Sequence, residues 1–76
     1  MSCQIAEEDM LRRGFQHKDS GGISYWIRAD GDTTVGYAED YDWLVVKRDG
    51  ITILDTIGVD TLEKIDSLLD KAKVRI

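Results

Sequence analysis

Apolar positions near the start of the chain follow a helical spacing. Three of them fall three and four residues apart, on one helix face: Cys3, Ala6 and Met10. We predict a short helix over residues 3–13, with acids in its first half and two arginines in its last turn, an order that complements the helix dipole. Gly14 can take the positive φ of a helix end, and Phe15 can then pack back onto Met10.

The middle of the chain alternates with period two, which is typical of β-strands. Residues 15–17 can begin a strand, and residues 18–22 are expected to form a loop. Two Asp-Gly pairs, at 30–31 and 49–50, tolerate the positive φ of tight hairpin turns. Four strands joined by short connections predict an antiparallel meander over residues 23–29, 33–39, 43–48 and 51–54.

The first of these four strands has two unlike faces. Alternation places Ile23, Tyr25 and Ile27 on one face and Trp26 on the other. Trp26 is therefore either buried by the predicted N-terminal helix or exposed as part of an interface. Gly36, in the middle of the next strand, indicates a bulge or the close approach of another group.

The end of the chain predicts a second, amphipathic helix. Asp60 and Glu63 stand three residues apart, as an N-cap and its reciprocal partner do. A stripe at helical spacing follows, and it should cover one face of the sheet: Leu62, Ile65, Leu68, Leu69 and Ala72. The predicted fold is one α+β domain over residues 1–76, in the order α-β-β-β-β-α, with helices on at least one face of a four-stranded antiparallel sheet.

Length and composition narrow the class of protein. A chain of 76 residues has room for one modest core. Its longest apolar run, residues 43–46, is far shorter than the ~20 residues of a membrane helix. The first residues lack the basic start and apolar stretch of a secretory signal, and the single cysteine, Cys3, cannot form an internal disulfide. We therefore expect a cytoplasmic protein that does not enter a membrane.

The net charge of −5 comes from one segment. Residues 29–46 contain five acids and no lysine or arginine, whereas the rest of the chain carries ten acids and ten bases. Two interpretations stay open, because the acids can keep exposed turns soluble or attract a basic partner. Direct nucleic-acid binding is not expected, since the only basic cluster, near the C-terminus, is sparse: Lys71, Lys73 and Arg75.

Motifs for catalysis and metal binding fail on inspection. Residues 19–22, Asp-Ser-Gly-Gly, match the nucleophile motif of chymotrypsin-like proteases over four residues only, and His17 lies on the same predicted loop, whereas triad members converge from distant elements. A calcium loop beginning at Asp30 would need Gly and Glu where Val35 and Tyr41 stand. One histidine and one cysteine cannot supply a structural zinc site. We expect no enzymatic activity, no cofactor and no metal.

Aromatic residues beside carboxylates are the remaining feature that the core does not require. Trp and Tyr are enriched at binding hot spots. Stacked nucleic-acid bases are not favoured there, because the neighbouring carboxylates would repel phosphates. The candidate binding residues are Trp26, Asp30, Asp32, Glu39, Asp40, Tyr41, Asp42 and Trp43.

From Leu11 to Ala72 the chain resembles the short acidic α+β proteins that are common among phage and mobile-element reading frames. The resemblance lies in size, charge and pattern: a helix ending in Gly14-Phe15, a meander with Asp-Gly turns, and a closing helix over residues 61–69. Several such proteins are anti-defence inhibitors, including anti-CRISPR proteins, so the resemblance implies an inhibitor. It includes no family motif and carries over no functional residue.

Two hypotheses from different classes follow. The first is a non-enzymatic protein-interaction module whose acidic aromatic segment occupies a basic surface of a nucleic-acid-binding protein, with carboxylates standing in for phosphates. The second is a homo-oligomeric scaffold or small-ligand sequestering protein. In that case Trp26 and the outer face of the sheet would be buried between protomers, and any ligand site would lie at their interface.

Overall fold

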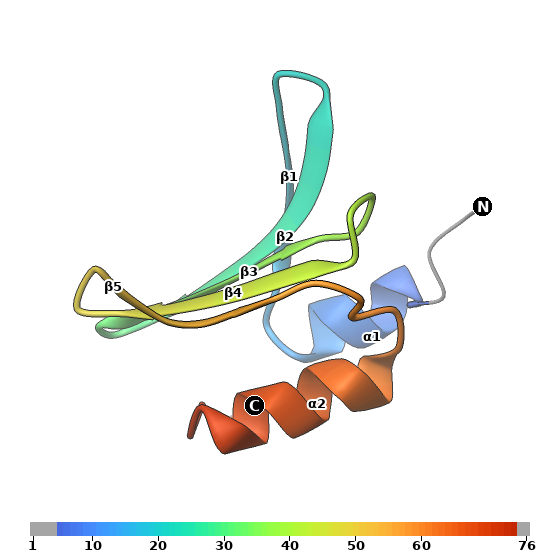
Figure 1. The fold of residues 1–76 in the computed structure, drawn as a ribbon. Helices are drawn as coiled ribbons and strands as arrows, with labels where there is room; N and C mark the ends of the chain where they lie inside the picture. The colour runs from blue at the N-terminus through green and yellow to red at the C-terminus, as the bar shows by residue number, and fades with distance from the viewer. Residues whose placement is uncertain (1–4, 75–76) are drawn as a thin grey trace.

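Two helices and a five-stranded sheet make up the fold, in the order α-β-β-β-β-β-α (Figure 1). The computed structural model describes residues 5–74, so the predicted roles of Cys3 and Arg75 lie outside the described residues. The elements are α1 (Glu7–Arg12), β1 (Gln16–Ser20), β2 (Ile23–Asp30), β3 (Thr33–Ala38), β4 (Trp43–Arg48), β5 (Ile51–Thr56) and α2 (Leu62–Lys71).

The sheet is an antiparallel meander with its strands in sequence order, as predicted, but it has five strands and not four. The additional strand, β1, takes in residues 18–20, which were expected to form a loop. Gly21 and Gly22 adopt φ values of 59° and 84°, the positive values of a two-residue type I′ turn. Because two residues complete this turn, the chain before it stays paired with β2 as far as Ser20.

Both helices pack against the same face of the sheet, as Figure 1 shows from the side. The core between them is a single apolar layer. Trp26 belongs to this layer with 4% of its surface exposed, which confirms the core interpretation of this residue. The residues of the core layer are Ile5, Met10, Phe15, Trp26, Val35, Tyr37, Leu44, Val46, Val59, Ile65, Leu69 and Val74.

Strand β3 decides which face of the sheet is covered. Its residues are alternately buried and half-buried, with Val35 and Tyr37 among the buried ones and Gly36 between them on the other face. Strand pairing extends the buried face of β3 to its two neighbours, because Trp26 and Leu44 both stand opposite Tyr37. The aliphatic side of β2, which includes Ile23 and Ile27, therefore lies on the face that neither helix covers.

Helix α1 ends as the sequence predicts. Gly14 has a φ of 87°, its N–H donates to the Leu11 carbonyl, and the N–H of Phe15 donates to the Met10 carbonyl at 3.1 Å. This pair of bonds is a Schellman motif. It turns the chain so that Phe15, the residue immediately before β1, enters the core.

Helix α2 begins one residue later than predicted. Its N-cap is Thr61, whose hydroxyl oxygen accepts from the Lys64 backbone N–H at 3.2 Å, so the assignment of Asp60 as the N-cap was wrong. The Asp60 carboxylate instead accepts from the Lys64 ammonium at 2.8 Å. The apolar stripe of the helix is confirmed, with Ile65 and Leu69 fully buried beneath the sheet.

Polar bonds fix the two helices to each other and to the sheet. The Arg13 guanidinium forms two bonds of 2.9 Å with the Asp66 carboxylate, and this pairing raises the pKa of Arg13 above its ordinary value. The Tyr37 hydroxyl donates to the Val59 carbonyl at 2.7 Å just before α2 begins. At the other end of α2, Arg48 donates to the Ala72 carbonyl at 3.1 Å.

We expect truncation of the core layer to destabilise the domain severely. Leu69→Ala removes a fully buried side chain and should lower the free energy of unfolding by about 2–5 kcal/mol, through lost transfer energy and the cavity left behind. Ile57→Ala is the control, because Ile57 is 74% exposed and its truncation should change the stability by only about 0.5 kcal/mol. Urea unfolding followed by circular dichroism measures both, and equal effects would contradict the placement of α2.

Candidate functional site

The five clustered acids do not form one patch, because β3 separates them. Asp30 ends β2 and Asp32 lies in the two-residue turn that follows, so the turn is Gly31-Asp32 and not the predicted Asp30-Gly31, whereas the other three acids lie in the loop between β3 and β4. Strand β3 has six residues, so its ends are about 17–20 Å apart at ~3.3 Å per residue. A partner smaller than the sheet can therefore contact only one of the two acidic groups.

The acids at the β2–β3 turn have basic neighbours. The Asp30 carboxylate lies 3.7 Å from the Arg28 guanidinium. The backbone carbonyl of Asp32 accepts from the N–H of Asp49, which brings the β4–β5 turn to the same end of the sheet. Arg48, next to that turn, bonds the hydroxyl of Thr33 at 3.3 Å. These two arginines offset much of the negative charge at this end.

The loop between β3 and β4, residues 39–42, is here called the acidic loop. Its first residue, Glu39, points to the covered face, where its carboxylate lies 3.4 Å from the Trp26 indole nitrogen and 3.5 Å from His17 Nε2. Asp42 has a φ of 51°, and its carbonyl accepts from the Val59 N–H at 2.8 Å. Asp40 and Tyr41 are exposed at the tip.

Trp43 follows the acidic loop and belongs to the face without helices. Its indole N–H donates to the Asp55 carboxylate of β5 at 2.6 Å, which fixes the ring across the neighbouring strand. The side chain is still 42% exposed, and Tyr41 in the adjoining loop is 60% exposed. Two of the predicted aromatic residues therefore lie together at the surface, beside Asp40 and Asp42.

The face of the sheet that neither helix covers is here called the open face. Its strands bring together large apolar side chains that are half-buried or exposed: Ile23, Tyr25, Ile27, Trp43 and Val45. A hollow of about 370 Å³ lies at Gly36, and we call it the Gly36 hollow. It is lined on this face by Ser20, Ile23, Tyr25, Ala38, Trp43 and Val45. The acidic loop connects Ala38 directly to Trp43 and so borders the hollow.

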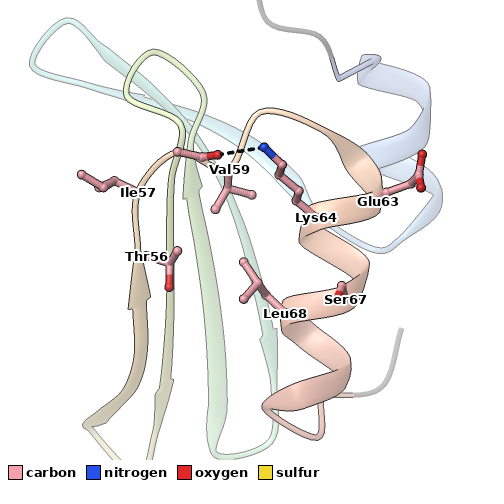
Figure 2. A pocket seen from close by; sticks show the side chains of 8 residues that line it. Thr56, Ile57, Val59, Glu63, Lys64, Ser67 and Leu68 are labelled. Atoms are coloured by element: carbon pink, nitrogen blue, oxygen red, sulfur yellow. Dashed lines mark hydrogen bonds between the residues drawn. The ribbon is translucent and has the colours of Figure 1, made fainter.

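A second groove, of about 460 Å³, lies between the end of β5 and helix α2 (Figure 2). Figure 2 shows the side chains of Val59 and Leu68 along its floor and Lys64 reaching across one end to the Gly58 carbonyl. The Lys64 ammonium is also bound by Asp60, and this bond lowers the pKa of the Asp60 carboxyl. The one cation of this groove is thus already paired, so the groove is the weaker candidate.

The described residues do not form the catalytic or metal-binding arrangements that their residue types could supply. Across residues 5–74 no three His, Cys, Asp or Glu side chains come together as metal ligands do. The motif residues His17 and Ser20 sit on one exposed edge strand, β1, where the Asp19 carboxylate accepts from the hydroxyl of Ser24 instead. Also within the described chain, no helix has the length and apolar character needed to span a membrane.

Sequence reasoning identified part of this surface. It singled out Tyr41, Trp43 and the carboxylates of the acidic loop, which the structure brings together, and it also included Trp26, which lies in the core. It missed the open face, since the aliphatic residues of β2 were not expected to be uncovered. The available signal was in β3, whose residues on the open face alternate with the buried ones and are small: Thr34, Gly36 and Ala38.

Comparisons of the chain with protein-family models, with curated proteins and with solved structures found no match.

The two tryptophans should report which face of the sheet is open. In a Trp43→Phe variant only Trp26 emits, and we expect blue-shifted fluorescence that acrylamide quenches poorly, because this indole is buried under the helices. The wild-type protein should show stronger quenching, since Trp43 contributes. Strong quenching of the Trp43→Phe variant would mean that Trp26 is accessible and that the faces are assigned wrongly.

Proposed function

We propose that this chain is a non-enzymatic protein-interaction module that binds a basic protein with its open face and acidic loop. The single observation that carries the proposal is the group of large apolar side chains left uncovered on one sheet face, next to exposed aromatics and carboxylates. Monomeric proteins seldom expose contiguous apolar patches unless these bind something.

The composition of this surface supports a protein partner. Trp43 and Tyr41 belong to the residue types that dominate the energy of protein interfaces. The apolar side chains lie in the middle of the surface and the charged ones at its border, which is the usual arrangement of a protein interface. Backbone pairing fixes the strand that carries Trp43, so this part of the surface loses little backbone freedom when a partner binds.

Charge supports a basic partner. The acidic loop contains no lysine or arginine; His17 faces Glu39 on the covered side, and the nearby Lys64 ammonium is bound by Asp60 and the Gly58 carbonyl. Asp40 and Asp42 therefore contribute an uncompensated negative field beside the open face, which would speed association with a cationic surface. A nucleic-acid-binding protein has such a surface, and the carboxylates would occupy it in place of phosphates. Inhibition of that protein is the consequence we propose.

The test uses purified protein as bait in host-cell lysate. Asp40→Lys combined with Asp42→Asn changes the loop charge by three, and Asn tolerates the positive φ at position 42. We expect this variant to lose a basic partner that the wild type captures. The affinity should fall at least tenfold, which corresponds to about 1.4 kcal/mol of binding free energy. High salt should release the same partner from the wild type.

The control matches the variant in both charge and backbone. Asp32→Lys with Asp49→Asn makes the same change at the other end of β3, and Asp49 also has a positive φ, of 54°. We expect the control to keep the partner. If both variants lose it equally, net charge and not the acidic loop accounts for binding; if neither does, the proposal fails.

Self-association through the open face is the second candidate, because an apolar sheet face can pack against a second copy of itself. The net charge of −5 opposes it. We expect sedimentation equilibrium to give the monomer mass of 8.6 kDa. A dimer that Val45→Lys converts to monomer would instead favour a homo-oligomeric scaffold, with any ligand site between the two open faces.

A further inference from the structure

The Gly36 hollow exists because β3 has no side chain at its centre. Gly36 stands opposite Ile27 on one side and Val45 on the other, so the neighbouring strands surround it with larger residues. A Cβ atom built at this position would meet no atom within 4 Å, and the residue is not among those with positive φ. Neither backbone conformation nor packing within the chain therefore requires glycine here.

The walls of the hollow suit an aromatic occupant. Tyr25 and Trp43 present rings, and Ile23, Ala38 and Val45 present aliphatic surface. Its volume of about 370 Å³ lies near the lower end of the ~300–1,000 Å³ range of ligand pockets, enough for one large side chain but not for an extended ligand. An aromatic ring that packs against the rings of Tyr25 and Trp43 gains energy beyond the burial of its area.

The border of the hollow adds a charge requirement. Asp40 and Asp42 lie in the loop that joins two of its lining residues, Ala38 and Trp43, and the Asp55 carboxylate accepts from the indole N–H of Trp43. An acidic or phosphorylated segment would be repelled there. A cation placed beside the occupant could pair with these carboxylates and also lie against the Trp43 ring.

We propose that the Gly36 hollow is the anchor site of this module and takes one aromatic side chain from a partner segment, with arginine residues next to it in sequence. The inference depends on the proposed function, since it names the part of the partner that the open face recognises. Phe, Tyr or Trp would fill the hollow, and the flanking guanidinium groups would pair with Asp40 and Asp42.

A peptide of this composition tests the inference without knowledge of the partner. The probe is acetyl-Arg-Arg-Trp-Arg-Arg-amide, and the matched peptide has Ala in place of Trp. Titration into ¹⁵N-labelled protein should give saturable amide shifts at Gly36, Ala38, Val45 and the Trp43 indole. The Ala peptide should bind at least about tenfold more weakly, because the aromatic anchor is the hot spot.

Gly36→Val should abolish this binding by filling the hollow. The fold should tolerate the change, since the position is open and valine favours strands over glycine. Ala29→Val is the matched control, because Ala29 is an exposed residue on the same face, opposite Thr34 and outside the hollow. An unchanged amide pattern away from β3 and a melting temperature no lower than wild type verify folding, and only the Gly36 variant should lose the peptide.

The outcomes separate this inference from the proposed function. If Asp40→Lys with Asp42→Asn weakens binding of the peptide but Gly36→Val does not, the binding role of the acidic loop is supported and the anchor site is overturned. If Gly36→Val weakens it and the loop variant does not, the anchor site stands and the charge requirement fails. Equal binding of the Trp and Ala peptides, shifts outside the open face, or no saturable shift overturns the anchor site, whatever the lysate experiment gives.

Discussion

The structure depends on one apolar layer between the sheet and two helices. A chain of this length supplies one helix of six residues and one of ten, and both lie on the same face. Burial of each large side chain in that layer contributes about 1.5–3 kcal/mol, so the layer supplies most of the favourable energy of folding. Within residues 5–74 no further helix or strand covers the second face of the sheet, the open face.

The hairpin connections determine where polar groups lie relative to that face. Because consecutive strands run antiparallel, the turns alternate between the two ends of the sheet, and acids close in sequence are carried to opposite ends. Arg28 and Arg48 lie near Asp30 and Asp32, whereas Asp40 and Asp42 in the acidic loop have no lysine or arginine partner among residues 5–74. The acidic loop therefore leaves unpaired carboxylates at one end of the open face, and under the proposed function this asymmetry would orient a basic partner.

Local sequence chemistry predicted the elements whose signals are local. Gly14 after a helical stripe and Asp-Gly at 49–50 each specify a backbone conformation, and both were confirmed. The turn predicted at 30–31 was wrong by one residue, because Asp30 ends β2 and the turn consists of Gly31 and Asp32, of which only Gly31 has a positive φ. Gly21-Gly22 carries the same kind of information, but the polar residues before it hid a strand, since β1 is an exposed edge with no apolar alternation to detect. The shift of the N-cap from Asp60 to Thr61 is a smaller error with a different cause, because both residues can cap a helix.

The covered face could not be read from β2 alone. Ile23, Tyr25 and Ile27 look more like a core than Trp26 and its polar neighbours, and only the pairing with Tyr37 of β3 shows the reverse. Burial is a property of the whole sheet face, so the strand with the clearest contrast between its faces determines it for all the others.

The two edge strands of the sheet differ in their exposed apolar surface, because β1 has none whereas Ile51 and Ile53 of β5 are exposed. Strand β1 presents only polar or charged side chains, and the pairing of β5 shifts register beside Val46 and Lys47, where the irregular edge hinders addition of another strand. Association by backbone pairing would accept almost any extended segment. Under the proposed function, the open face with its hollow and charged border would instead select a partner by side-chain shape and charge.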